Sequence, residues 1–203
     1  MVDHYFSNQP VVGHDLRLIR QKLRGFNLEF WTDAGVFSKG GIDFGSALLI
    51  ETMEISEKDR VLDVGCGYGP IGITAAKLAV NGSVLMIDIN ERAVELARKN
   101  LTQNAVQNAE VRVSNLFEQV AEKDFDRIFT NPPIRAGKAV VHQIFEEAGR
   151  RLTPRGELWV VIQKKQGAPS ARKKLEELFE DVQDKAKDAG YRIFCCKKPK
   201  SFV

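Results

Sequence analysis

Short apolar runs and amphipathic stretches take turns along the chain from about residue 57 onward. Arg60–Val64 is a short apolar run that ends in glycines, whereas the apolar residues of Glu91–Gln103 recur at helical spacing on one face. The predicted strands are Arg60–Val64, Ser83–Ile87, Glu110–Val113, Phe125–Thr130, Leu158–Ile162 and Tyr191–Cys196. The predicted helices are Pro70–Leu78, Glu91–Gln103, Lys138–Leu152 and Ala171–Phe179.

The stretch before residue 57 has a less regular pattern. Leu16–Thr32 partly fits helical spacing, but its alternation of apolar and polar residues favours a two-stranded hairpin that turns at Arg24-Gly25. A glycine-rich loop follows over residues 33–41, and then a helix from about Phe44 to Met53. These elements predict a small hairpin extension ahead of the strand–helix repeats.

Repeated strand–helix units predict an α/β fold with a mostly parallel sheet, because right-handed crossovers place the helices on both faces. Ligands of such sheets bind at the carboxyl ends of the strands. The chemistry is therefore expected in the residues that follow the strands directly.

A glycine-rich loop follows the first of these strands, in Asp63-Val64-Gly65-Cys66-Gly67-Tyr68-Gly69. Glycines allow a tight turn and bring bare backbone against a ligand, and a helix N-terminus begins behind them at Pro70. The G-x-G-x-G spacing fits neither the dinucleotide fingerprint nor the Walker loop. A tight turn without a ligand is the alternative.

Asp88 closes the second strand, where a carboxylate can accept both hydroxyls of a ribose that lies over the glycine loop. Its alternative role is to cap the helix that begins at Glu91. Asn90 is better placed for that cap, which leaves Asp88 for the ribose.

The tetrapeptide Asn131-Pro132-Pro133-Ile134 follows the strand Phe125–Thr130. Two prolines make its backbone rigid, although a plain turn would also contain them. The Asn131 side-chain oxygen and the Pro132 carbonyl could accept both hydrogens of an exocyclic amino group. This would turn the nitrogen lone pair toward an electrophile, so that no strong base is needed before attack.

Composition and charge narrow the class of protein. The 203 residues are 43% hydrophobic, enough for one substantial domain, and no apolar run reaches membrane-spanning length. The start carries no signal-peptide pattern, and the three cysteines and three histidines have no disulfide or zinc spacing. We therefore expect a cytoplasmic protein without metal or membrane.

The net charge of +3 divides unevenly along the chain. Residues 150–203 hold fourteen Lys and Arg against seven Asp and Glu, an excess that suggests an anionic partner. Two clusters, Arg172-Lys173-Lys174 and Lys197-Lys198-Pro199-Lys200, are either part of an RNA footprint or a solvated surface.

Together, the glycine loop, Asp88 and the Asn-Pro-Pro-Ile tetrapeptide resemble the class I S-adenosylmethionine-dependent methyltransferases. With the segments 32–46 and 131–138, the chain is similar to the ribosomal RNA guanine-N2 methyltransferases of the RsmC/RlmG type, from His4 to the last strand. The resemblance implies a Rossmann-like, seven-stranded sheet of order 3-2-1-4-5-7-6. It also implies that Val182–Ala186 is a strand rather than a continuation of the preceding helix.

The resemblance implies a division of labour within the site. The residues expected to hold S-adenosylmethionine are Asp63, Gly65, Cys66, Gly67, Gly69, Asp88, Ile89, Asn115, Leu116 and Asn131, with Phe37, Ser38, Asp43 and Ser46 closing the pocket. The expected catalytic residues are Asn131, Pro132, Pro133 and Ile134. Arg135 and Lys138 are expected to contact RNA; the alternative is that they are solvated cations at the start of a helix.

The chain also departs from the family pattern. Members that methylate ribosomal RNA typically carry a second, degenerate copy of the fold, and here we expect only an extension, residues 1–56, packed on one methyltransferase domain, residues 57–203. Asn115 stands where an acid is frequent, and Ile134 where many amino methyltransferases have an aromatic residue. Such a chain would act on ribosomal RNA or a ribosomal subunit as a monomer or small homo-oligomer.

Other functions remain open at this point. The same Asn-Pro-Pro chemistry serves protein glutamine or a small amine, although enzymes of that kind usually have an aromatic residue after the prolines. A non-catalytic RNA-binding module with this fold is the second alternative. An NAD-dependent oxidoreductase is a distant third, because the glycine spacing disfavours it.

Overall fold

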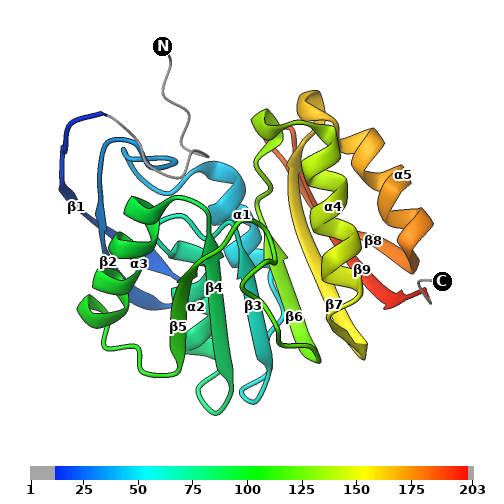
Figure 1. The fold of residues 1–203 in the computed structure, drawn as a ribbon, viewed down its shortest axis with the longest axis horizontal. Helices are drawn as coiled ribbons and strands as arrows, with labels where there is room; N and C mark the ends of the chain where they lie inside the picture. The colour runs from blue at the N-terminus through cyan, green and yellow to red at the C-terminus, as the bar shows by residue number, and fades with distance from the viewer. Residues whose placement is uncertain (1–11, 201–203) are drawn as a thin grey trace.

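The structure is a computed structural model that describes residues 12–200. It contains a seven-stranded sheet and a separate two-stranded hairpin. Figure 1 shows the elements in chain order. The sheet order is β5 (Ala109–Val113), β4 (Ser83–Asp88), β3 (Arg60–Val64), β6 (Phe125–Thr130), β7 (Leu152–Gln163), β9 (Tyr191–Pro199) and β8 (Phe179–Asp188). This confirms the predicted order, with two added to each number for the hairpin strands.

The strands β5, β4, β3, β6 and β7 run parallel to one another, while β9 is antiparallel to both β7 and β8. The segment Val182–Ala186 therefore belongs to a strand, as expected. The five parallel strands bring their carboxyl ends to one edge, and the β8–β9 hairpin places Tyr191 beside Gln163 at that same edge.

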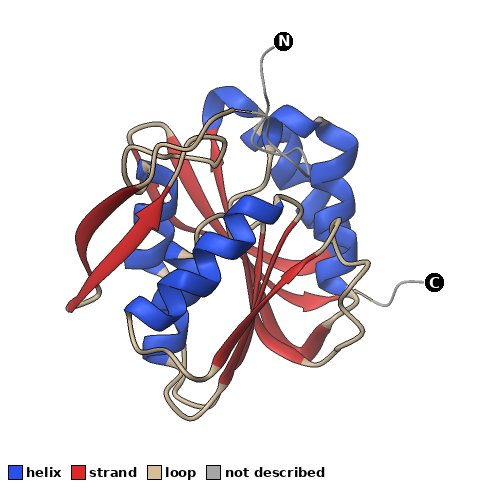
Figure 2. Ribbon diagram, turned by 60° about the vertical axis from the view of Figure 1, so that its left-hand side comes forward, coloured by secondary structure: helices blue, strands red, loops and turns tan. Residues whose placement is uncertain are grey.

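Helices cover both faces of the sheet (Figure 2). One face packs against α1 (Phe44–Thr52), α2 (Pro70–Leu78) and α3 (Glu91–Gln103), and the other against α4 (Lys138–Gly149) and α5 (Ala168–Leu178). Consecutive residues of a strand face opposite sides, so Cys195 lies in the first core and Cys196 in the second. The predicted three-layer arrangement is thereby confirmed.

The hairpin of β1 (Arg17–Leu23) and β2 (Phe26–Thr32) stands outside the sheet, at the left of Figure 2. Its turn is at Arg24-Gly25, where both residues have positive φ, as a type I′ turn requires. The edge of β2 is tied to α3, because Asn100 Oδ1 accepts from the Trp31 N–H at 2.7 Å. This confirms the hairpin over the helical alternative.

Several predicted boundaries were wrong. The helix expected over Lys138–Leu152 ends at Gly149, and β7 begins at Leu152 rather than Leu158. The register against β6 shifts between Phe125 and Arg127, so the strand accommodates an irregular segment around Pro154 and Gly156 that resembles a loop in sequence. Likewise, α5 begins three residues earlier than expected, and Phe179 belongs to β8.

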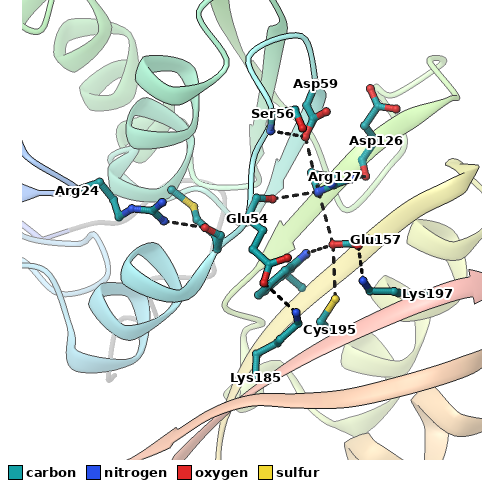
Figure 3. A network of polar contacts seen from close by, with 12 residues as sticks. Arg24, Glu54, Ser56, Asp59, Asp126, Arg127, Glu157, Lys185, Cys195 and Lys197 are labelled. Atoms are coloured by element: carbon teal, nitrogen blue, oxygen red, sulfur yellow. Dashed lines mark hydrogen bonds and ion pairs between the residues drawn. The ribbon is translucent and has the colours of Figure 1, made fainter.

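A polar cluster fixes β6, β7 and β9 to one another toward the amino end of β6 (Figure 3). The buried carboxylate of Glu157 accepts from Lys197 Nζ at 2.8 Å and from the Trp159 indole N–H at 2.9 Å, and it lies 3.5 Å from Arg127 Nε. Burial alone would raise the pKa of Glu157. The hydrogen bonds and charges of these partners outweigh burial, so the pKa is lowered below its ordinary value. The cluster lies away from the carboxyl ends of the strands.

Candidate functional site

A cavity of about 440 Å³ lies at the carboxyl ends of the strands. It receives residues from the loop after β2, the first turn of α1, and the ends of β3, β4, β5 and β6. The predicted site residues among its lining are Phe37, Ser38, Asp43, Ser46, Gly65, Cys66, Gly67, Asp88, Ile89, Asn115, Leu116, Asn131, Pro132, Pro133, Ile134 and Arg135. The structure therefore brings together most of the residues that the motifs single out.

Three predicted site residues are not part of the lining. Asp63 is fully buried behind it, Gly69 is the N-cap of α2 with φ 101°, and Lys138 begins α4 as an exposed side chain. Asp63 and Gly69 therefore support the glycine loop from behind.

The glycine loop is tied to the neighbouring strand. The N–H groups of Gly65 and Cys66 both donate to the Ile87 carbonyl, at 2.9 and 3.0 Å. Gly65 and Gly67 have positive φ, and a Cβ at either position would point into open space. Bare backbone thus faces the cavity, where a bound group can approach it closely.

Asp88 holds this loop and leaves acceptor capacity free. Its Oδ2 accepts from the Gly67 N–H at 2.8 Å, and its Oδ1 from the Asn90 N–H at 2.9 Å. Asn90 caps α3 by accepting from the Ala93 N–H at 3.2 Å, as predicted. The Ile89 N–H is a third backbone donor to this carboxylate, and Asp88 lines the cavity with the acceptor capacity that remains.

Asp63 is the least satisfied acidic group of the site. Its Oδ2 accepts from the Gly72 N–H at 2.8 Å, but its buried Oδ1 has no hydrogen-bond partner among the described residues. Burial raises the pKa of this carboxyl to about 7, the Gly72 N–H opposes the rise, and the charge of Asp88 adds to it. Burial also raises the pKa of Asp88.

The Asn131 amide has a defined orientation. Its Nδ2 donates to Ser46 Oγ at 3.0 Å and to Asp43 Oδ1 at 3.3 Å. A carboxylate only accepts, so the nitrogen must face Asp43 and the oxygen must face away from it. No hydrogen bond from the described residues reaches Asn131 Oδ1.

The backbone after Asn131 offers a second acceptor. The Pro133 carbonyl accepts from the Ala136 N–H at 2.9 Å and begins η1 (Ile134–Ala136), whereas no hydrogen bond from the described residues reaches the Pro132 carbonyl. Two oxygens of the tetrapeptide are thus available to the two hydrogens of one amino group.

Asn115 shows the same arrangement at the other end of the cavity. Its Nδ2 donates to Glu118 Oε1 at 2.8 Å, which leaves the amide oxygen as a free acceptor. Its neighbour Leu116 has positive φ and is half-buried in the lining. An amide oxygen beside an apolar side chain suits a flat base that carries an amino group.

The structure adds lining residues that sequence reasoning missed. Most are neighbours of the motifs, and proximity in sequence could have found them: Val64, Tyr68, Pro70, Ile71, Ile87, Ala93, Ser114, Ala136, Val140 and Ile144. Gln166, in η2 (Lys164–Gln166), and Tyr191, at the start of β9, also line the cavity. No sequence signal connects these two residues with the motifs, because only the sheet topology brings them there.

The basic side chains differ in their partners. Lys174 is ion-paired with Glu146 at 2.6 Å, and Arg172 with Glu176 and Asp184 at 2.8 and 2.6 Å. In the described part of the chain, Arg135, Lys138, Lys164 and Lys165 are exposed and belong to no ion pair. Arg135 lines the cavity, and Lys164 and Lys165 directly precede Gln166, which also lines it, so these three cations lie close to the mouth of the cavity.

Residues 12–200 contain no group of three or more side chains placed to hold a metal ion, and no helix of this segment is long and apolar enough to cross a membrane. All three cysteines are free and buried.

The fold and the cavity define the class of protein, and comparison with known proteins agrees. Residues 27–195 match the family model described as the methyltransferase small domain. The chain belongs to this family and has its Rossmann-like methyltransferase fold.

The relatives fall into two groups by length. Over 200 residues the chain is 50% identical to a Bacillus subtilis (strain 168) protein described as the uncharacterized protein YbxB, covering 98% of this chain and 100% of that one. It is 35% identical over 175 residues to ribosomal RNA small subunit methyltransferase C of Haemophilus influenzae (strain PittGG), covering 84% of this chain and 52% of that protein.

Among solved structures, the chain is similar to the Thermus thermophilus 16S rRNA N2 G1207 methyltransferase (RsmC) in complex with AdoMet and guanosine. The TM-score is 0.78 at 28% identity, over 93% of this chain and 52% of that one. The chain thus spans about half the length of the ribosomal RNA methyltransferases that it matches.

Proposed function

We propose that this protein transfers a methyl group from S-adenosylmethionine to an exocyclic amino nitrogen, namely N2 of a guanine in ribosomal RNA. The observation that carries the proposal is the orientation of the Asn131 amide, whose nitrogen is held by Asp43 and Ser46 while its oxygen is left as an acceptor. With the Pro132 carbonyl, it offers two acceptors to the two hydrogens of the amino group.

These acceptors act on the nitrogen before and after transfer. By accepting both N–H groups, they turn the lone pair out of conjugation with the ring and toward the methyl donor. The nitrogen gains positive charge as the new bond forms, and the two oxygens stabilise that charge. The surplus proton leaves only after transfer, so the site needs no strong base, and positioning contributes most of the rate.

The cavity suits S-adenosylmethionine, which supplies a methyl group already activated by its positively charged sulfur. Bare backbone at Gly65, Cys66 and Gly67 would face the methionine part, with Gly69 shaping the loop behind it. The unpartnered Asp63 Oδ1 offers negative charge behind this loop, where the cofactor is cationic.

The other cofactor groups have matching partners. Asp88 would accept the two ribose hydroxyls, while Asn115 Oδ1 would accept from the adenine amino group and Ile89 and Leu116 would pack on its ring. Phe37 and Ser38 would close the pocket from the loop after β2.

RNA is the substrate that the charges around the mouth favour. Arg135 and Lys138, exposed and outside any ion pair among the described residues, would contact phosphate or the guanine edge. Lys164 and Lys165 would extend this contact along the opposite side of the mouth. Ile134 would pack on the target base.

Three further expectations stay predictions. They are the division into an extension, residues 1–56, and a methyltransferase domain, residues 57–203; a monomeric or small homo-oligomeric state; and a cytoplasmic location.

The relative that is solved with AdoMet and guanosine supports this choice over glutamine or a small amine. The direct experiment supplies tritiated S-adenosylmethionine to purified protein with ribosomal RNA, with intact ribosomal subunits and with ribosomal protein. Label in N2-methylguanosine supports the proposal. Label in protein glutamine favours the second candidate, and undetectable cofactor binding by calorimetry favours the non-catalytic RNA-binding module.

A further inference from the structure

Tyr191 is a side chain of the cavity that has no role in the mechanism above. Tyr191 begins β9, is half-buried, and lines the same cavity as Asn131 and Ile134. Ile134 stands where many amino methyltransferases have an aromatic residue that stacks on the target base. The lining therefore contains an aromatic ring from outside the Asn-Pro-Pro-Ile tetrapeptide, on β9, which three strands of the sheet separate from β4, where Asp88 ends the strand.

The backbone of Tyr191 is held from two sides. It pairs with Gln163 of β7 and with Asp188 of β8, and the Lys164 N–H donates to the Gly190 carbonyl at 2.7 Å next to it. A residue fixed in this way presents its ring with little loss of conformational entropy on binding.

The Tyr191 ring rests on the first turn of α1. Its centroid lies 5.7 Å from that of Phe44, at an interplanar angle of 37°. A Cβ added to Gly45 would come within 2.8 Å of Tyr191 Cε1 and 3.0 Å of Cδ1, so the absence of a side chain at Gly45 is what permits this position of the ring.

The same turn also holds the Asn131 amide. Asp43 caps α1 by accepting from the Ser46 N–H at 3.0 Å, and both Asp43 and Ser46 accept from Asn131 Nδ2. Residues 43–46 therefore connect the group that would hold the target nitrogen with a flat aromatic side chain. Such a pairing of acceptor and ring is the chemistry that recognises an amino-bearing base.

We infer that Tyr191 supplies the aromatic face on which the target base stacks, in place of the aromatic residue that is absent at Ile134. This inference rests on the proposed function and extends it to the recognition of the base. Asp43 and Ser46 act as positioning residues through Asn131, and Gly45 provides the space for the ring.

Two substitutions at Tyr191 separate stacking from other contributions. Tyr191→Leu removes the ring and raises the KM for a guanine-containing ribosomal RNA, by about 5- to 150-fold if stacking on one base is lost. Tyr191→Phe keeps the ring and retains most of the wild-type kcat/KM. Both variants bind S-adenosylmethionine with wild-type affinity. Phe26→Leu, in the hairpin and outside the cavity lining, is the matched control and leaves the KM unchanged.

A double-mutant cycle tests whether the ring acts through its position. Gly45→Ala displaces the ring and lowers kcat/KM for the RNA, while in the Tyr191→Leu background the same substitution has a smaller effect, because the clash with the ring is gone. The remaining effect would come from Asp43 Oδ1, 3.1 Å from the added Cβ. Equal effects in both backgrounds would contradict the inference.

The outcomes also distinguish this inference from the proposed function. If the wild-type protein places no methyl group on guanine N2, the proposed function fails. If it does so and Tyr191→Leu keeps the wild-type KM for RNA, only the inference about Tyr191 is overturned. Loss of S-adenosylmethionine binding in Tyr191→Leu would also overturn it, since the ring would then serve the cofactor.

Discussion

At the scale of single residues, the site depends on which polar atoms have partners and which do not. The Asn131 nitrogen is engaged while its oxygen is free, and the Asp63 carboxylate is half-satisfied and buried. An unpartnered polar atom is costly inside a protein, so a bound molecule that donates to Asn131 Oδ1 gains affinity, whereas Asp63, buried behind the cavity wall, can act on a bound molecule only through its charge. This contrast yields separate predictions for transfer and for cofactor binding.

Asn131→Ala should abolish methyl transfer while leaving S-adenosylmethionine affinity nearly intact. The expected loss in kcat is at least about a hundredfold, as is typical when one positioned hydrogen-bonding group is removed from a reaction centre. Single-turnover transfer and calorimetry measure the two effects separately. A collapse of cofactor affinity would show that the role assigned to Asn131 is wrong.

Asp63→Asn should change the pH dependence of stability in the cofactor-free protein. The pKa of Asp63 rises from 3.8 to about 7 on folding, so the folded state prefers the protonated form. The stability linked to this group is fully present below pH 3.8 and is lost as the pH rises through about 7. Urea unfolding at several pH values should show a flatter profile for the variant than for the wild type over that window.

The same substitution should weaken S-adenosylmethionine binding at pH 8, where the wild-type carboxylate is ionised. The expected pattern is therefore a variant that is more stable at pH 8 and binds the cofactor less tightly. If the pH profiles of stability run parallel in the two proteins, the buried Asp63 carboxyl does not titrate near neutral pH.

At the scale of elements, the pattern of apolar residues predicted the helices, the hairpin and every strand of the sheet except β8, because their burial follows periods of 3.6 and 2. The β8 strand was expected only from the family resemblance, since its sequence could also continue the preceding helix. The apolar pattern failed where tertiary structure overrides local signals: Pro154 and Gly156 indicate a loop, yet β7 passes through them as an irregularity opposite Phe125. The residues of the cavity differ in the same way: those next to a sequence motif were predictable, and those brought in by the sheet topology were not. Asp88 and Asn131 were predictable because they follow strands directly, whereas Tyr191 arrives by the pairing of β9 with β7.

Glu157→Gln should destabilise the fold through the polar cluster that joins β6, β7 and β9. The substitution removes the charge that pairs with Lys197 and Arg127 in a buried place, at an expected cost of about 1–3 kcal/mol. Because the pKa of Glu157 is lowered on folding, this contribution is present above pH 4.5 and is lost as the pH falls through the lower folded value.

Glu110→Gln provides the matched control for Glu157. Glu110 is an exposed glutamate on β5 that pairs with Arg112, so its loss should cost less than about 0.5 kcal/mol. Urea denaturation at pH 7 compares the two variants. Equal destabilisation would mean that the cluster contributes no more than a surface ion pair.

At the scale of the whole molecule, the structure shows where the acidic and basic residues of the chain lie relative to the cavity. Acidic groups stand in and behind the cavity wall, in Asp43, Asp63 and Asp88, while Arg135, an exposed cation outside any ion pair among the described residues, lines the same cavity, and the exposed Lys164 and Lys165 directly precede the lining residue Gln166. Of the basic cluster in α5, Arg172 and Lys174 are neutralised by acidic neighbours. Lys173 alone in that cluster is exposed and outside any ion pair among the described residues, so the cluster offers less free charge to the proposed RNA substrate than Arg135, Lys164 and Lys165 do.

Neutralising Lys164 and Lys165 together, as glutamines, should weaken RNA binding and reduce its salt dependence. Each phosphate contact that is lost should lower the slope of log K against log salt by about 0.7–0.9. Lys58→Gln with Lys123→Gln removes the same charge from exposed lysines that precede β3 and β6, at the opposite edge of the sheet. Fluorescence anisotropy with a ribosomal RNA fragment should separate the pairs, and an equal loss in both would refute a role for the mouth.

The most direct test of the account is the product of the reaction. Purified protein is incubated with S-adenosylmethionine and ribosomal RNA from cells that lack this protein, and the RNA is digested to nucleosides for mass spectrometry. The account predicts N2-methylguanosine with the wild type and none with Asn131→Ala. Cofactor binding without any methylated guanosine, on naked RNA and on ribosomal subunits alike, would contradict it.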